Sequence, residues 1–175
     1  RIDTLQPPGL PGRIGLTFLP GKKGDALYGA PWDRDLGEDL RAILDWGADA
    51  VVSLLEPHEF ELLGVPDFPR VMSAQGFRWM LLEIRDSDVP DSRFESAWPL
   101  VQPELVAILR RGGSIVVHCR GGLGRTGLVV SRLLVELGLE AEKAISLVRE
   151  VRPGAVETWE QEEYIRQLPS RPIKS

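Results

Sequence analysis

The sequence has a single cysteine and two histidines, and it contains no dense run of Lys or Arg. One cysteine excludes an internal disulfide and favours a reducing compartment, so we expect a cytoplasmic protein. No stretch approaches the roughly 20 consecutive apolar residues that are needed to cross a bilayer. The formal net charge of -5 is opposite in sign to the basic footprint of nucleic-acid-binding proteins. We therefore expect a soluble chain with neither nucleic acid nor a membrane as its partner.

The length and composition predict one globular unit. The chain has 175 residues, of which 43% are hydrophobic, and this is enough for one well-filled core. Residues 1–12 are rich in Pro and Gly and predict an irregular N-terminal arm. Residues 13–170 predict a single domain, followed by a tail over residues 171–175. We expect this domain to be a monomer.

Apolar runs of strand and helix type alternate along the chain. The predicted strands cover residues 14–19, 50–55, 77–84 and 115–117. The predicted helices cover residues 35–46, 57–63, 66–75, 103–111, 126–137, 141–151 and 156–168. The helix at 103–111 is given no earlier start because Pro99 and Pro103 disturb helical hydrogen bonding. The β-branched run Ile115–Val117 is typical of a strand buried on both faces of a parallel sheet. These patterns predict an α/β fold with a mainly parallel sheet of about four to five strands flanked by helices.

The segment from His118 to Gly127 carries the strongest chemical signal. A thiol, Cys119, and a guanidinium, Arg125, stand with five residues between them, where a buried strand turns into a helix. Backbone amides in such a turn can surround a tetrahedral anion, assisted by the positive end of the helix. The predicted phosphate-binding residues are Cys119, Arg120, Gly121, Gly122, Leu123, Gly124 and Arg125, with Gly121, Gly122 and Gly124 allowing the curvature.

Each polar side chain of this segment has a predicted role. Arg125 can bind two phosphate oxygens with its planar fork, and the inward amides stabilise Cys119 as a thiolate nucleophile. Thr126 can donate its hydroxyl to the cysteine sulfur. His118 is expected to hold the loop through a backbone hydrogen bond rather than to act as a base. We expect neither a metal nor a cofactor.

At these residues the sequence resembles the cysteine-dependent protein phosphatase superfamily, whose signature is His-Cys, five residues, and then Arg-Ser/Thr. The resemblance extends over most of the chain to the kinase-associated phosphatase branch of the dual-specificity group. The segments that carry it are Leu19-Pro20-Gly21, Asp86-Ser87-Asp88-Val89-Pro90-Asp91, Cys119 to Arg125, and Gly154-Ala155-Val156. It implies a protein-tyrosine-phosphatase-like fold and the hydrolysis of phosphomonoesters through a phosphocysteine intermediate on Cys119.

The resemblance also assigns the acid that protonates the leaving oxygen. In the kinase-associated branch this acid is the first Asp of a D-x-x-x-P-D loop, which matches Asp86, with Asp88 and Asp91 as the other candidates. Trp98-Pro99 is similar to part of the Trp-Pro-Asp loop of tyrosine phosphatases, but it lies too close to Cys119 and is read as unrelated. Two glutamines that position the hydrolytic water in related enzymes correspond to Gln161, which matches, and to Glu157, which departs from the pattern.

The sequence leaves two other functions for this loop open, and it does not fix the identity of the substrate. The loop could serve a phosphate-recognition module without turnover, or an arsenate reductase or rhodanese-like enzyme, although the single cysteine leaves no internal resolving thiol. The chain has no Lys-Asn-x-x-Tyr segment and no paired lysines in the loop, which favours phosphotyrosine of proteins, with phosphoserine and phosphothreonine as further substrates. A phosphorylated small molecule is the remaining possibility. Phosphate and other oxyanions are expected to inhibit.

Overall fold

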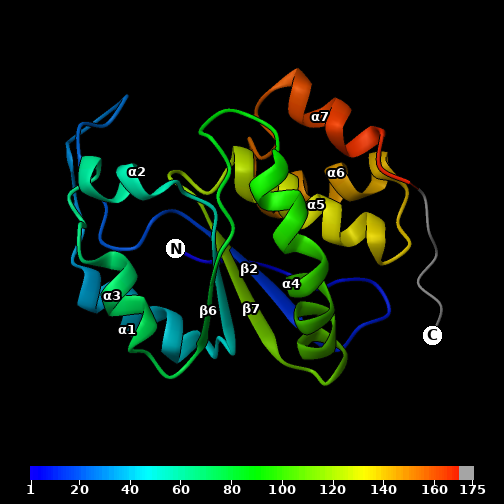
Figure 1. Ribbon diagram of the computed structural model, residues 1–175, viewed down its shortest axis with the longest axis horizontal. Helices are drawn as coiled ribbons and strands as arrows, with labels where there is room; N and C mark the ends of the chain where they lie inside the picture. The colour runs from blue at the N-terminus through cyan, green and yellow to red at the C-terminus, as the bar shows by residue number, and fades with distance from the viewer. Residues whose placement is uncertain (170–175) are drawn as a thin grey trace.

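A five-stranded mixed sheet forms the centre of the molecule (Figure 1). The computed structural model describes residues 1–169. The sheet has the order β1-β2-β7-β5-β6, in which β1 pairs with β2 antiparallel and the remaining pairs are parallel. Its strands are β1 (Asp3–Leu5), β2 (Arg13–Thr17), β5 (Ala50–Ser53), β6 (Arg78–Leu81) and β7 (Ser114–His118). A separate hairpin pairs β3 (Lys23–Gly24) with β4 (Trp32–Asp33). The mainly parallel sheet confirms the predicted α/β class.

Helices cover both faces of this sheet (Figure 1). One face is covered by α1 (Leu36–Trp46), α2 (Pro57–Leu62) and α3 (Phe68–Ser73). The other face is covered by α4 (Ser92–Arg110), α5 (Gly124–Glu136), α6 (Ala141–Val151) and α7 (Trp159–Arg166). None of the helices among the described residues has the length and apolar character that a membrane crossing requires.

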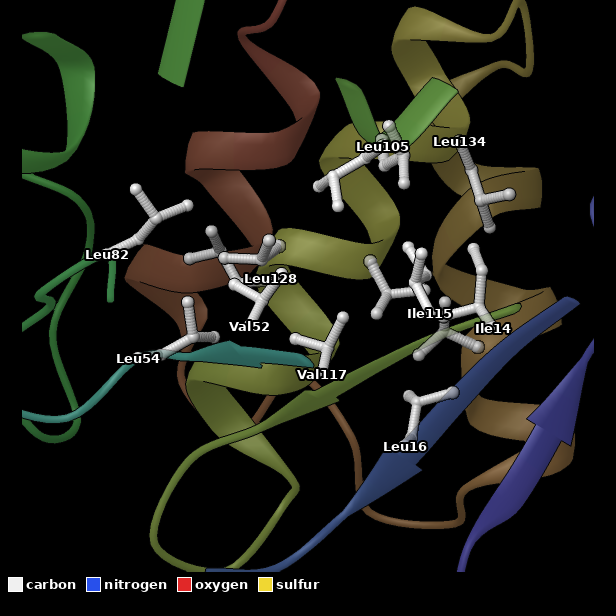
Figure 2. Packing of buried hydrophobic residues seen from close by; sticks show 14 of the residues in the cluster. Ile14, Leu16, Val52, Leu54, Leu82, Leu105, Ile115, Val117, Leu128 and Leu134 are labelled. Carbon is white, nitrogen blue, oxygen red and sulfur yellow. The ribbon is translucent and has the colours of Figure 1, made fainter. Parts of the chain in front are cut away.

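Side-chain alternation along the central strands fills two cores, one on each face. In β7, Ile115 and Val117 pack with the α4–α7 core, whereas Val116 packs with the α1–α3 core. Figure 2 shows Val117 beside Val52 of β5 and Leu128 of α5, and Ile115 beside Ile14 of β2. Burial on both faces explains why the sequence of β7 is apolar throughout.

The same alternation separates the two residues at the end of β7. His118 continues the Val116 side and faces the ring of Phe68 in α3, with 5.5 Å between the ring centroids. Cys119 lies on the same side as Val117 and packs with the α4–α7 core. The parity of the strand therefore places the thiol next to the N-terminus of α5 and the imidazole behind the loop.

The N-terminal segment corrects the expectation of an irregular arm over residues 1–12. Asp3–Leu5 forms β1, which pairs with β2, and Leu5 is buried. The segment gains order because Leu5 joins the main core and the ladder to β2 satisfies its backbone. The predicted tail at 171–175 lies outside the described residues.

Two helix boundaries also differ from the prediction. Helix α4 begins at Ser92 rather than near Pro103, and it contains both Pro99 and Pro103. Both prolines are exposed, so the carbonyls whose helical donors are missing lie on the side facing water. Helix α7 begins at Trp159 rather than Val156, because Thr158 caps it and forms a capping box with Gln161.

Candidate active site

The loop from Cys119 to Arg125 connects β7 to α5 and leaves its backbone donors free. Helix α5 begins at Gly124, and its N-cap residue, Leu123, provides no side-chain hydrogen bond. The amides of residues 120–126 find no acceptor in the part of the chain that the structure describes. Seven successive amides beside a helix N-terminus are the arrangement that binds a tetrahedral oxyanion. Cys119 is 3% exposed and lines the same cleft.

The geometry requires glycine at one of the three loop positions, Gly122, and leaves little room for a side chain at a second, Gly124. Gly122 has a φ of 74°, and a Cβ there would lie 2.3 Å from the carbonyl oxygen of Thr17. A Cβ on Gly124 would lie 2.6 Å from Glu157 Oε1 and also meet the carboxamide of Gln161. Gly121 corrects the expectation for all three, because its φ is not positive and its Cβ would meet open space.

Arg125 is anchored from behind by a buried carboxylate. Its Nη1 donates to Glu59 Oε2 at 2.8 Å and to the Ile84 carbonyl at 2.9 Å, and its Nη2 donates to Glu59 Oε1 at 2.8 Å. Burial alone would lower the pKa of Arg125, but the Glu59 hydrogen bonds and the charge of Cys119 raise it. The guanidinium is therefore fixed and fully charged while its Nε–H has no acceptor among the described residues.

The three candidate acids occupy different positions. Asp86 lies in the cleft with its Oδ1 3.1 Å from Arg125 Nη2, and its side chain is 49% exposed. Asp88 accepts a hydrogen bond from the amide of Val89. Asp91 caps α4 by accepting from the amide of Arg93, and it also pairs with the Arg93 guanidinium. Of the three, only Asp86 lines the cleft that contains Cys119.

His118 supports the loop from inside the protein. Its Nδ1 lies 3.2 Å from the Cys119 carbonyl oxygen and its Nε2 lies 2.5 Å from Ser53 Oγ. Burial lowers the pKa of His118 to about 4, so the ring is neutral at pH 7. A neutral ring that donates from Nδ1 to the carbonyl must accept from the Ser53 hydroxyl, which itself accepts from Trp79 Nε1 at 2.9 Å.

Thr126 and Gln161 are both buried, and their polar groups differ in hydrogen bonding. The Thr126 hydroxyl is buried and has no hydrogen-bond partner in the part of the chain that the structure describes, so the expected bond to the cysteine sulfur is not formed here. Gln161 is buried, and its Oε1 accepts from the amide of Glu157 at 2.9 Å while its Nε2 donates to the Asp88 carbonyl at 3.1 Å. The carboxamide thus links the segment before α7 to the Asp86 loop. Glu157 is exposed, precedes α7 rather than lying on it, and lines the cleft.

The cleft around Cys119 has a volume of about 780 Å³ and draws on distant parts of the chain. Its walls come from the loop 119–125, the Asp86 segment, Glu157, Lys22 and residues 25–34, which connect β3 to β4 and continue through β4. Trp98 is buried in α4 against Phe94, which agrees with setting the Trp98-Pro99 pair aside.

Comparison with known proteins assigns the chain to a family. The family model described as "Swiss Army Knife protein, DSP-PTPase phosphatase domain" matches residues 33–165. The chain belongs to this family. The match includes the Asp86 segment, the loop 119–125 and the Gln161 segment, whereas Lys22 and the cleft-lining residues up to Trp32 precede it.

Individual relatives of this phosphatase domain agree with the assignment. Cyclin-dependent kinase inhibitor 3 of Rattus norvegicus is 29% identical over 158 residues, which cover 89% of this chain and 71% of the relative. Tyrosine-protein phosphatase CDC14 of Saccharomyces cerevisiae is 48% identical over 50 residues, covering 28% of this chain and 9% of the relative. A crystal structure of kinase associated phosphatase, with its catalytic-site cysteine replaced by serine, is 25% identical and superposes with a TM-score of 0.83, covering 94% of this chain and 91% of the other. The fold and the phosphatase class predicted from the loop are confirmed.

Sequence reasoning missed two charged residues of the phosphatase site. Glu59, which binds Arg125, is 4% exposed, and Lys22, which lines the cleft, is 7% exposed. The sequence contains one local indication that Glu59 has a structural role, because Glu56 and Glu59 have the spacing of a capping box at the start of α2. Its pairing with Arg125 joins positions 66 residues apart, and no local pattern records it.

Proposed function

We propose that this domain hydrolyses phosphotyrosine of proteins, with phosphoserine and phosphothreonine as further substrates, through a phosphocysteine intermediate on Cys119. The observation that carries the proposal is the meeting of Cys119, Arg125 and Asp86 in one cleft, around a loop whose amides have no acceptor among the described residues. The names of the relatives, which include a tyrosine-protein phosphatase and a kinase associated phosphatase, support a phosphorylated protein as the substrate. The product phosphate and other tetrahedral oxyanions should inhibit by occupying the loop.

In the first step the Cys119 sulfur attacks phosphorus and the bond from phosphorus to the ester oxygen breaks. The loop amides and Arg125 hold the three equatorial oxygens, whose charge develops in the transition state. The contact between Arg125 Nη2 and Asp86 Oδ1 gives way to a phosphate oxygen, and Nε–H supplies the second donor of the fork. Glu59 and the Ile84 carbonyl keep the guanidinium in place during this exchange. Asp86, in its protonated form, gives its proton to the leaving oxygen.

In the second step water attacks the phosphocysteine and the bond from sulfur to phosphorus breaks. Asp86, now a carboxylate, removes a proton from the water, and the thiolate leaves. We assign Thr126 the role of donating its free hydroxyl to the sulfur as charge returns to it. The predicted role of Gln161 in positioning the water is compatible with its location, because one Nε2 hydrogen is left after the bond to the Asp88 carbonyl.

The nucleophile is tested by replacing Cys119 with Ser. Turnover of p-nitrophenyl phosphate and of a phosphotyrosine peptide should fall to the background rate, because the serine hydroxyl is not ionised in this setting. Rapid acid quench of the unmutated protein during turnover should yield a phosphorylated chain by intact mass spectrometry, and Cys119→Ser should not. Normal turnover by Cys119→Ser would rule out the proposed chemistry.

The acid is tested by comparing Asp86→Asn with Asp91→Asn. Asp86→Asn should lower kcat by about 10²–10⁴, with the greater loss for phenyl phosphate, whose leaving group needs protonation more than p-nitrophenol does. Asp91→Asn is the matched control, since asparagine retains the cap of α4 and the side chain lies outside the cleft. A larger loss in Asp91→Asn than in Asp86→Asn would transfer the acid role away from Asp86.

A further inference from the structure

Lys22 is a buried lysine on the wall of the active-site cleft. It follows β2 through the turn Leu19–Gly21, and the amide of Leu19 donates to the Arg120 carbonyl at 3.1 Å. This bond brings the turn against the Cys119–Arg125 loop. Lys22 is 7% exposed and lines the cleft together with Cys119 and Arg120.

The charge of Lys22 has an aromatic support but no carboxylate partner among residues 1–169. Its Nζ lies 4.2 Å from the ring centroid of Trp32, across the β3–β4 hairpin. It forms no ion pair within the described residues, whereas the adjacent Lys23 pairs with Asp33 at 2.9 Å. Burial and the nearby charge of Arg120 lower the pKa of Lys22, and the charges of Cys119 and Asp86 oppose this. A cation in these surroundings is stabilised by an anion that enters the cleft.

The scissile phosphate does not account for this charge. In the proposed mechanism its ligands are the loop amides and Arg125, which Glu59 holds in a fixed orientation. Arg120 is the second cation beside Lys22, and its one carboxylate contact is loose, with Nη1 3.9 Å from Asp86 Oδ2. Lys22 and Arg120 therefore form a basic pair at the side of the phosphate-binding loop.

We propose that Lys22, supported by Trp32 and assisted by Arg120, is a specificity-determining residue that binds a carboxylate next to the phosphorylated residue of a peptide substrate. The inference rests on the proposed function, because it assigns the substrate sequence that the same site selects. The ring of Trp32 holds the ammonium in place, so little side-chain freedom is lost when the carboxylate binds. The attraction acts at the rim of the site and contributes to substrate binding rather than to bond cleavage.

The experiment compares two phosphotyrosine peptides that differ only in having Asp or Asn on both sides of the phosphotyrosine. The selectivity is the ratio of kcat/KM for the Asp peptide to that for the Asn peptide. The unmutated protein should favour the Asp peptide, and Lys22→Met should lower the ratio by about tenfold through KM, as expected for the loss of one ion pair that salt can screen. Lys22→Arg should retain the preference. Lys23→Met is the matched control and should leave the ratio unchanged, because Lys23 is exposed and lies outside the cleft.

The outcomes separate this inference from the proposed function. If the unmutated protein cleaves both peptides and p-nitrophenyl phosphate, but Lys22→Met lowers both peptide rates equally, the inference is overturned and the phosphatase assignment stands. If the unmutated protein cleaves none of them, the proposed function fails first. The salt dependence of the unmutated protein gives a test without any variant, since the ratio should fall between about 0.05 and 0.5 M ionic strength as the ion pair is screened. A ratio that does not change with salt contradicts the proposal.

Discussion

The active-site cleft has two walls that are built in different ways. The wall formed by the loop 119–125 is half-buried to buried, and its Arg125 is only 1% exposed and bound to Glu59 on a separate helix. The wall formed by the hairpin, for which residues 25–33 line the cleft, ends in Leu27 and Tyr28, which are 96% and 93% exposed. Two residue pairs form the ladder of this hairpin. One cleft thus combines a wall fixed by buried polar contacts with a wall that has few contacts to the core.

We expect the loop wall to carry out phosphoryl transfer and the hairpin wall to contact the rest of the substrate. Phosphoryl transfer requires the thiol, guanidinium and amides to keep their relative positions within fractions of an ångström, which buried contacts from several elements provide. Contacts with the rest of a substrate tolerate a more mobile surface, and segments with few core contacts open at low free-energy cost. We therefore expect substitutions behind the loop to affect stability and turnover strongly, and substitutions at the hairpin tip to leave stability nearly unchanged.

The largest expected effect concerns His118 and the dependence of stability on pH. Its folded pKa of about 4 lies below the ordinary value of 6.5, so the unfolded chain binds this proton first. The contribution of His118 to stability is present above pH 6.5 and is lost as the pH falls toward 4, with a total of about 3 kcal/mol. Urea unfolding between pH 7 and pH 4 measures this loss.

The variant His118→Gln isolates that contribution. It should be less stable than the unmutated protein at pH 7, because the link from Ser53 to the Cys119 carbonyl is changed, but it should lose less stability on acidification. His58→Gln is the control, since His58 is an exposed residue of α2, and it should keep the slope of the unmutated protein. Identical slopes for His118→Gln and the unmutated protein would show that the imidazole is not held neutral.

The next largest effect is expected at Glu59, which positions Arg125 from behind the loop. Glu59→Gln removes the charge but keeps the shape, and it should lower kcat by about 10–100-fold, equivalent to about 1.4–2.7 kcal/mol, as partners that orient a catalytic group do. Steady-state kinetics on p-nitrophenyl phosphate, well below the unfolding temperature, measure the loss.

Glu61→Gln provides the comparison for Glu59→Gln. Glu61 is an exposed residue of the same helix, so its substitution should leave kcat unchanged. Urea unfolding of both variants separates a loss of positioning from a loss of folded protein. If Glu59→Gln retained full kcat, Arg125 would not depend on this partner, and the buried wall would be less constrained than its contacts indicate.

The residues of the site differ in how far the sequence alone could predict them. The loop 119–125 could be predicted as a phosphate-binding site because its thiol, glycines and guanidinium lie in one continuous segment that follows an apolar strand. Asp86 could be proposed as the acid from the resemblance. Only the positions of the side chains distinguish it from the other two candidates, Asp88 and Asp91. Glu59 and Lys22 reach the site through tertiary folding, and neither belongs to the segment that carries the motif.

The fold was predictable to a similar extent, for similar reasons. The apolar runs at β5 and β7 are determined by burial on both faces and were placed correctly. The start of α4 was missed because a local proline rule does not record that Pro99 and Pro103 face water. Strand β1 was missed because a single buried residue, Leu5, and pairing with β2 decide it, and a three-residue strand has no periodicity to detect.

The smallest expected effect is at the hairpin tip. Leu27→Ala should change the free energy of unfolding by less than about 0.5 kcal/mol, because the side chain is almost fully exposed. Leu54→Ala is the matched comparison within the core, where the same kind of truncation should cost about 2–5 kcal/mol. Urea unfolding of both variants gives the two values directly. A cost above about 2 kcal/mol for Leu27→Ala would mean that the tip packs against the protein in solution, and the contrast between the two walls would then be lost.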